Sequence, residues 1–198
     1  MAPPYAEHMA EVVRGLARRL RLPALERRHN SVIVLGTFSL VNGFLSIALM
    51  ALAAYLTGAP LVFPSLGPTA FLLFYTPRAA AASPRNTLAG HTIGVLAGYA
   101  SLAAFGLTTA GPAGGHEVTA ARVGAAALSL GLTAGFMVWL RVPHPPAGAT
   151  TLIVSLGVIT EPADQAVVML GVLLLLVQGF VINRLAGIDY PLWASKTQ

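Results

Sequence analysis

His144-Pro145-Pro146-Ala147-Gly148-Ala149-Thr150 interrupts a hydrophobic stretch that would otherwise form a helix across a membrane. Proline has no backbone N–H, and prolines and glycines at membrane depth leave polar backbone groups that lipid cannot satisfy. Such a break is tolerated mainly where protein or a water-filled cavity surrounds it. The break therefore marks a candidate functional site.

The composition around this break is that of an integral membrane protein. Of the 198 residues, 56% are hydrophobic and 10% are charged, whereas roughly a quarter are charged in an ordinary soluble domain. The charges are also unevenly spread, because five long windows contain no Asp, Glu, Lys or Arg. These windows are residues 31–77, 86–115, 123–140, 142–160 and 165–183.

The net charge of +5 does not indicate a nucleic-acid partner. Six of the twelve Lys and Arg residues precede the first hydrophobic window, where basic residues set the orientation of a span and contact anionic lipid headgroups. The chain has no cysteine, which excludes disulfides and thiolate metal ligands. The sequence predicts the lipid bilayer as a partner, no nucleic acid and no cofactor.

The hydrophobic windows divide the chain into four parts. Residues 1–30 are expected to form a cytoplasmic lead-in with an amphipathic helix on the membrane surface, and residues 191–198 a cytoplasmic tail. Residues 31–110 and 111–190 are expected to form two membrane units. Long spans are predicted over 32–57, 86–107, 120–140 and 166–185, and short helices over 67–75 and 147–159.

The basic residues between spans predict the orientation. If both broken segments cross the membrane, the cytoplasmic connections contain Arg78, Arg85, Arg141 and Arg184, as the positive-inside tendency favours. Arg122 is then the one basic residue on the outer side. If the broken segments re-enter instead, only four spans cross and the fit is poorer. We therefore expect six crossings in an integral protein of the bacterial inner membrane, with both termini cytoplasmic.

An offset of 81 residues relates the two units. It places Pro64-Ser65-Leu66-Gly67-Pro68-Thr69-Ala70 on residues 145–151, and the flanking spans coincide within a few residues. Two units of three crossings each must run in opposite directions through the membrane. The predicted fold is all-α: two inverted repeats, each with two long transmembrane helices flanking a broken segment that ends in a half-helix.

Each half-helix is expected to begin near mid-membrane, so that two helix N-termini face each other. Backbone N–H groups and the helix dipole favour an anion there, and the absence of Arg and Lys from the spans favours a small monovalent one. Gly67 and Gly148 allow close approach of the backbone. The predicted substrate-binding residues are Ser65, Leu66, Gly67, Thr69, Ala147, Gly148, Ala149, Thr150, Thr151 and Asn42.

Several of these residues have a simpler structural interpretation. Prolines and glycines also kink helices and allow tight packing, and such small residues favour homo-oligomers in membranes. His91 and His144 are candidates for proton coupling or gating, because histidine titrates near neutral pH, or are buried neutral side chains. Asn86 is expected to cap its helix.

Three motifs resemble the HPP family of small integral membrane proteins. They are the His-Pro-Pro stretch, residues 64–70 and Pro84-Arg85-Asn86-Thr87-Leu88-Ala89-Gly90-His91, in family order. That family is usually described as having four transmembrane helices, a description that counts only the long spans. It includes cyanobacterial and plastid members linked to nitrite transport. The resemblance thus implies nitrite, a small monovalent anion, as substrate.

Other functions fit less well. The spans contain no carboxylate pair for acid–base chemistry and no His-x-x-x-His spacing for zinc, so we do not expect an enzyme. A passive anion channel of the same architecture is a closer alternative. A membrane scaffold or sensor that transports nothing is the third.

Overall fold

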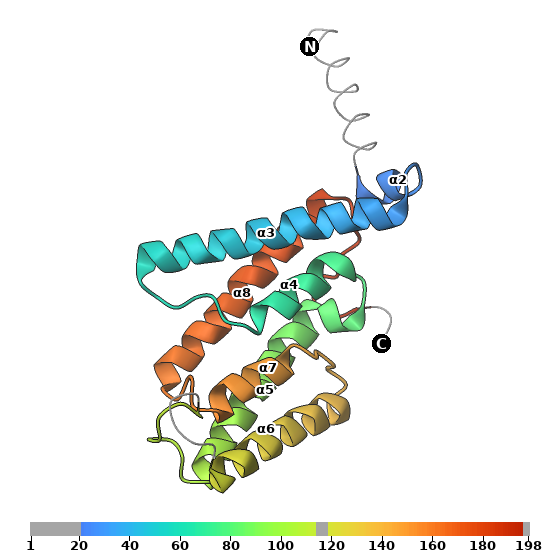
Figure 1. Ribbon diagram of the computed structural model, residues 1–198. Coiled ribbons are helices and arrows are strands. Elements are labelled where there is room, and N and C mark those ends of the chain that lie inside the picture. The colour runs from blue at the N-terminus through green and yellow to red at the C-terminus, as the bar shows by residue number, and fades with distance from the viewer. Residues whose placement is uncertain (1–20, 114–118, 196–198) are drawn as a thin grey trace, which may run out of the picture.

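The computed structural model describes residues 21–113 and 119–195, and every regular element in these ranges is a helix (Figure 1). The predicted all-helical class is confirmed, and most predicted bounds agree within a few residues. The α-helices are α2 (Leu22–Glu26), α3 (Ser31–Thr57), α4 (Leu66–Tyr75), α5 (Pro84–Ala104), α6 (Ala120–Trp139), α7 (Ala147–Ser155) and α8 (Pro162–Leu185), with a short 3₁₀ helix η1 (Ala80–Ala82). The proposed amphipathic helix of the lead-in falls mainly on residues 1–20, outside the described residues.

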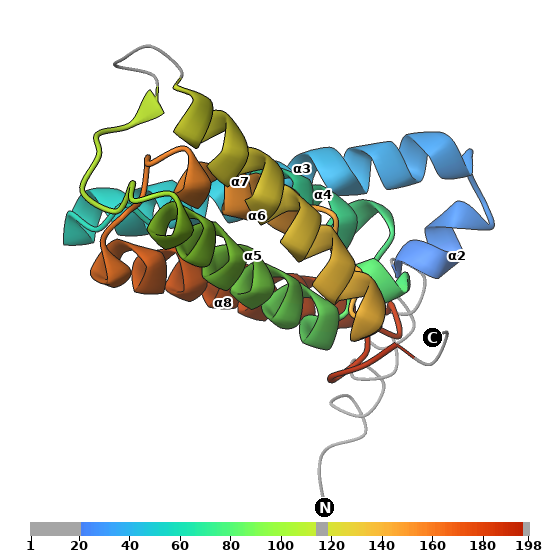
Figure 2. The same ribbon diagram turned by 90° about the horizontal axis from the view of Figure 1, so that it is seen from below.

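The helices pack around a centre formed by α5 and α8, which contact each other. The short helix α4 packs against α3 and α8, and the short helix α7 packs against α5 and α6 (Figures 1 and 2). Each short helix therefore touches one long helix from each half of the chain. The two halves are interlocked rather than side by side.

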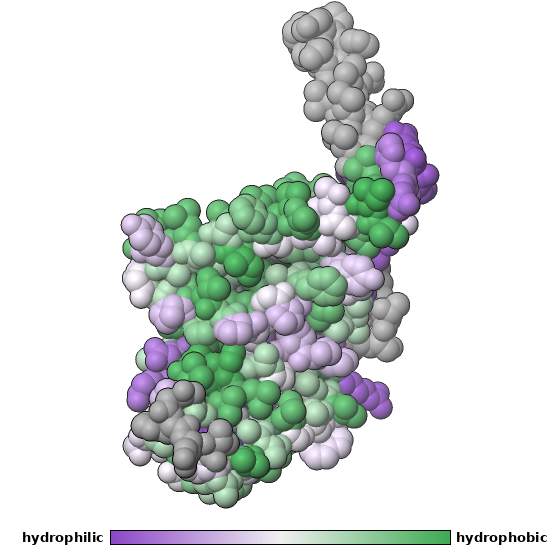
Figure 3. All heavy atoms as spheres, viewed as in Figure 1, coloured by the Kyte–Doolittle hydropathy of each residue, from purple (hydrophilic) through white to green (hydrophobic). Residues whose placement is uncertain are grey.

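Three of the described helices are long and apolar enough to cross a membrane: α3, α6 and α8. The outer surface of α3 carries large exposed hydrophobic side chains, including Val32, Phe44 and Tyr55, and is visibly apolar in Figure 3. The fourth long helix, α5, is more polar, and ten of its 21 residues are buried. The polar side chains of Asn86, Thr87, His91 and Ser101 are buried by the helices around it.

Side-chain caps fix where three of the long helices begin. Asn30 accepts hydrogen bonds from the N–H groups of Val32 and Ile33, and Thr119 accepts one from Arg122 N. At α5 the cap is Ser83, whose Oγ accepts from Asn86 N at 3.4 Å, with Pro84 at the first helical position. The prediction that Asn86 caps this helix is wrong, because Ser83 already provides the acceptor. The buried Asn86 side chain instead donates to Pro143 O.

The two breaks lie where the sequence predicts them. Residues 58–65 and 140–146 are not helical, and α4 and α7 follow directly. Helix α7 ends at Ser155, four residues before the predicted end, because Gly157 adopts a left-handed conformation with φ of 78°. Likewise, α5 ends at Ala104 rather than residue 107, and α8 begins four residues early, at Pro162.

Arg122, the one basic residue that the charge count leaves on the predicted outer side, has a structural role. Its side chain is buried, and its guanidinium donates to Ser155 O at 3.3 Å and to Gly111 O at 2.7 Å. Ser155 is the last residue of α7, so the cation lies at the negative end of the helix dipole.

Substituting Arg122→Gln should therefore destabilise the fold by about 1–3 kcal/mol, because two buried carbonyls lose a charged donor. Thermal unfolding of the purified protein in detergent measures this loss. The matched control is Arg141→Gln, since Arg141 is exposed. Equal melting temperatures for the Arg122→Gln variant and the unsubstituted protein would contradict this role.

Candidate functional site

Four residues singled out from the sequence meet in one hydrogen-bonded cluster, the histidine–threonine network: Thr69, His91, His144 and Thr150. The two imidazoles lie with Nε2 atoms 3.1 Å apart and ring centroids 4.8 Å apart. Thr69 Oγ1 lies 3.0 Å from His91 Nε2 and 3.3 Å from His144 Nε2. Thr150 Oγ1 lies 2.7 Å from His91 Nδ1. Thr69 therefore contacts both histidines, and Thr150 contacts His91.

The network draws on both halves of the chain. Thr69 lies in the first turn of α4 and Thr150 in the first turn of α7, and the 81-residue offset aligns these two threonines. They contact the two opposite nitrogens of His91, which lies on α5 seven residues after Pro84, or about 10 Å along the helix axis. All four side chains are at most 1% exposed. The network is enclosed within the helix bundle.

The hydrogen-bond partners fix the tautomers of both neutral histidines. Ala81 O, 2.7 Å from His144 Nδ1, can only accept, so His144 carries its proton on Nδ1 and presents a bare Nε2. His91 must then donate from Nε2 to His144, and its Nδ1 accepts from the Thr150 hydroxyl. Thr69 donates to Ser65 O at 2.9 Å, so its oxygen can only accept, and the single Nε2–H of His91 is shared between His144 Nε2 and Thr69 Oγ1.

The result is a continuous chain of donors from Thr150 through both imidazoles to a backbone carbonyl. The two imidazoles each accept and donate, whereas Thr150 donates at the start of the chain and Ala81 O accepts at its end. Within the described ranges no group of three or more His, Asp or Glu side chains could hold a metal ion. The arrangement is suited to holding and passing protons and to donating hydrogen bonds to a small ligand.

Sequence reasoning missed two members of this site. Thr87 Oγ1 lies 3.5 Å from His144 Nδ1, and Ala81 of η1 supplies the terminal acceptor. Thr87 precedes His91 by four residues on one helix face, a spacing that could have found it. Ala81 could not be found, because only its backbone takes part.

Two predicted hydroxyls border the network with unused hydrogen-bonding capacity. Ser65 Oγ and Thr151 Oγ1 are both completely buried and have no partner. Ser65 directly precedes α4, and Thr151 follows the network residue Thr150. A buried hydroxyl without a partner costs free energy, so each is a donor available to a ligand.

The backbone at the two helix starts is less open than the sequence suggests. The N–H groups of Ala147, Gly148 and Ala149 donate to the carbonyls three residues earlier, at 3.0 Å each, and Leu66 N does the same to Phe63 O. Gly67 is exposed, and a Cβ added there would meet nothing within 4 Å. Donors to a ligand are therefore more readily supplied by hydroxyls and imidazoles than by these N–H groups.

Asn42 is not brought to the network. Its Nδ2 donates to Phe38 O of its own helix at 2.7 Å. Its side chain lines a surface groove between α2 and α3, together with Leu22 and Leu25.

Comparison with known proteins gives one finding. The family model for the transmembrane region of HPP proteins matches residues 28–191, which include every residue of the network. No curated protein and no solved structure matches the chain.

Proposed function

Because the chain belongs to the HPP transmembrane family, we propose that it is a membrane transporter of a small monovalent inorganic anion, with nitrite as the leading substrate. The observation that carries this proposal is the enclosed network, in which Thr69 and Thr150 form hydrogen bonds with His91 and His91 contacts His144. Buried ionisable groups at membrane depth are costly and are characteristic of substrate and proton pathways.

The chemistry of the site suits a small anion. No Asp, Glu, Lys or Arg is part of the network. A monovalent anion therefore meets no carboxylate that would repel it, whereas a divalent anion would find no Lys or Arg to balance its second charge. The orphan hydroxyls of Ser65 and Thr151 provide donors that the resting structure does not use. A protonated imidazole adds both a donor and a positive charge.

The same network supports proton coupling. A proton added to His144 Nε2 would face the Nε2–H of His91 across 3.1 Å. His91 relieves this conflict by carrying its proton on Nδ1 instead, and the Thr150 hydroxyl then accepts rather than donates. One proton entering with one anion keeps the enclosed site neutral, which avoids the cost of an isolated buried charge.

Matched packing contacts support an inverted repeat with the short helices as half-helices. A Cβ on Gly98 would lie 2.7 Å from Val154 Cβ, and one on Gly179 would lie 2.9 Å from Leu73 Cδ1. The 81-residue offset converts one pair into the other. The helix contacts are related by the same offset. Helix α7 packs against α5 and α6, and the corresponding helix α4 packs against α8 and α3. In such a design, alternating access follows when one unit rocks against the other.

The charge distribution supports the orientation with both termini in the cytoplasm of a bacterial cell, at its inner membrane. Arg78, Arg85, Arg141 and Arg184 then lie on the cytoplasmic side. The outward Arg122 is accounted for by its contacts with Gly111 O and Ser155 O.

Removing the orphan hydroxyls should impair transport without impairing the fold. In the double variant Ser65→Ala, Thr151→Val, we expect the KM for nitrite to rise about tenfold, as the loss of about 1.4 kcal/mol of anion binding requires. The melting temperature should hold or rise, because neither hydroxyl has a partner to lose.

The matched control is Ser101→Ala, which removes another buried hydroxyl without a partner, ten residues beyond His91 on α5. It should leave the KM unchanged. An unchanged KM in the double variant would contradict a role for Ser65 and Thr151 in binding.

Uptake of labelled nitrite into proteoliposomes tests the proposed function. We expect uptake above that of protein-free vesicles, accelerated by an imposed inward proton gradient. Uptake that ignores the gradient would favour the passive channel. If nitrite, nitrate, formate and chloride all fail to cross, both the transporter and the channel are excluded. The membrane scaffold or sensor is then the remaining function.

A further inference from the structure

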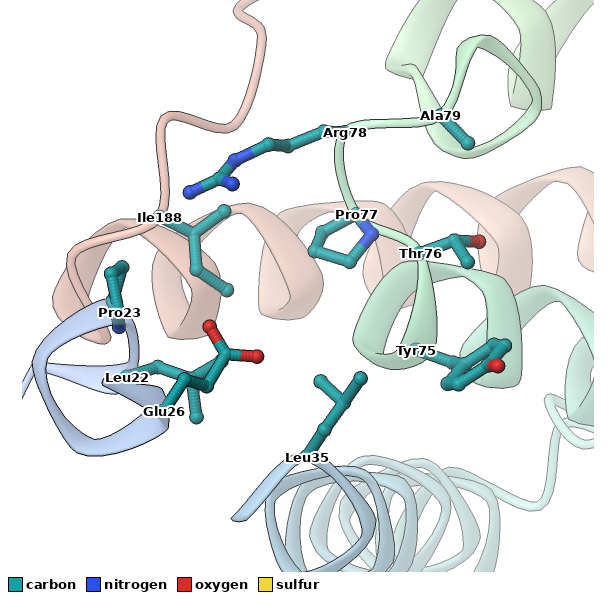
Figure 4. A pocket seen from close by; sticks show the side chains of 10 residues that line it. All are labelled: Leu22, Pro23, Glu26, Leu35, Tyr75, Thr76, Pro77, Arg78, Ala79 and Ile188. Carbon is teal, nitrogen blue, oxygen red and sulfur yellow. The ribbon is translucent and has the colours of Figure 1, made fainter. Parts of the chain in front are cut away.

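A cavity whose lining includes none of the network residues lies where α2, the start of α3 and the end of α4 meet. It has a volume of about 460 Å³ and lies among Leu22, Glu26, Leu35, Tyr75, Arg78 and Ile188. In Figure 4 the Glu26 carboxylate points into the space between Pro77, Leu35 and Ile188, and the Arg78 side chain runs along the edge of this space with its guanidinium next to Ile188. The cavity lining thus combines one cation, Arg78, and one carboxylate, Glu26, with apolar side chains.

An apolar groove continues from this cavity along the outside of the helix pair α3 and α4. The groove has a volume of about 520 Å³ and shares Glu26, Leu35 and Tyr75 with the cavity. Its walls include Val32 and the stacked rings of Phe71 and Tyr75, whose centroids are 4.9 Å apart. At Gly36 an added Cβ would meet nothing within 4 Å, so the groove is open there.

We propose that this cavity and groove together hold one phospholipid with a phosphoethanolamine headgroup. The guanidinium of Arg78 binds the phosphate, for which its planar fork of donors is suited. The carboxylate of Glu26 accepts hydrogen bonds from the primary ammonium. One acyl chain lies along Gly36, Leu35 and Phe71.

Charge complementarity selects this headgroup over the other common ones. Phosphatidylglycerol offers a phosphate to Arg78 but no cation to Glu26. Phosphatidylcholine offers a cation, but its quaternary ammonium has no N–H to donate. The cavity lies at the end of α3 that follows the basic residues Arg27 and Arg28, which places the headgroup at the membrane surface on the side predicted to be cytoplasmic.

Native mass spectrometry of the delipidated protein, with dioleoyl phosphatidylethanolamine, phosphatidylglycerol or phosphatidylcholine added back in detergent, tests this proposal. We expect one phosphatidylethanolamine to be retained at the highest occupancy. Arg78→Gln should weaken its binding about tenfold, as the loss of a charge-assisted contact of about 1.4 kcal/mol requires. Glu26→Gln should reverse the preference toward phosphatidylglycerol, and Gly36→Leu should weaken binding of all three lipids.

Two matched controls keep the test specific. Arg27→Gln removes an exposed charge of the same kind outside the cavity, and Gly43→Leu adds the same bulk to α3 where an added Cβ also meets nothing within 4 Å. Neither should change lipid retention, and water-soluble glycerophosphoethanolamine should compete only weakly. Equal retention of the three lipids, unaffected by Arg78→Gln and Gly36→Leu, would overturn the proposal and indicate nonspecific annular lipid.

Discussion

Substituting His91→Gln should abolish the acceleration of nitrite uptake by an inward proton gradient. Glutamine can keep a hydrogen bond to Thr69 or Thr150, but it cannot take up a proton or exchange its donor and acceptor atoms. We expect gradient-driven uptake in proteoliposomes to fall at least about tenfold, which corresponds to about 1.4 kcal/mol in the barrier.

The matched control is His29→Gln, since His29 is an exposed histidine just before α3. It should behave as the unsubstituted protein does. A melting temperature measured for each variant separates a lost proton carrier from a lost fold. Undiminished, gradient-dependent uptake by a well-folded His91→Gln variant would refute proton coupling through this network.

The largest loss of stability is expected from Gly94→Leu. A Cβ at Gly94 would lie 2.8 Å from the backbone oxygen of Ala147 and 3.4 Å from Thr150 Cβ, so α7 must move away from α5. Overpacking of this kind costs about 1–3 kcal/mol or more. The displacement also separates Thr150 from His91, so the variant should lose both thermal stability and nitrite uptake.

Gly131→Leu is the matched control for this substitution. Gly131 lies on α6, and an added Cβ there meets nothing within 4 Å. We expect it to change the melting temperature little and uptake not at all. If Gly94→Leu were as stable and active as Gly131→Leu, the close packing of α7 on α5 would not be needed to hold the network together.

The hydropathy pattern and the Pro and Gly residues that interrupt it predict most of this fold. The bounds of α3, α4 and α6 follow from the hydrophobic windows and from the Pro and Gly residues between them. The ends of α5 and α7 and the start of α8 are less well predicted, because left-handed Gly106 and Gly157 follow the first two ends and Pro162 takes the first position of α8. Ser83 rather than Asn86 caps α5, since Pro84 fixes the first helical position one residue after it.

The candidate site is predictable in its residues but not in its arrangement. Both histidines and both threonines are identifiable from the breaks and motifs. Their mutual contact depends on α7 packing closely on α5 at Gly90, Gly94 and Gly98, where an added Cβ would lie within 2.9 Å of α7 or the residues before it. Sequence alone cannot reveal that packing. The breaks are visible in the sequence, but only the packing of α7 on α5 brings the two histidine side chains into contact.

The proton-to-nitrite stoichiometry is the decisive test of proton-coupled nitrite transport by this protein. Proteoliposomes containing a pH-sensitive dye, with the membrane potential clamped by potassium and valinomycin, report both quantities, and protein-free vesicles correct for nitrous acid that crosses lipid unaided. We expect one proton to enter with each nitrite, at a rate that does not depend on the membrane potential, and no such proton entry with His91→Gln. Nitrite entry that follows the potential and carries no proton would contradict it.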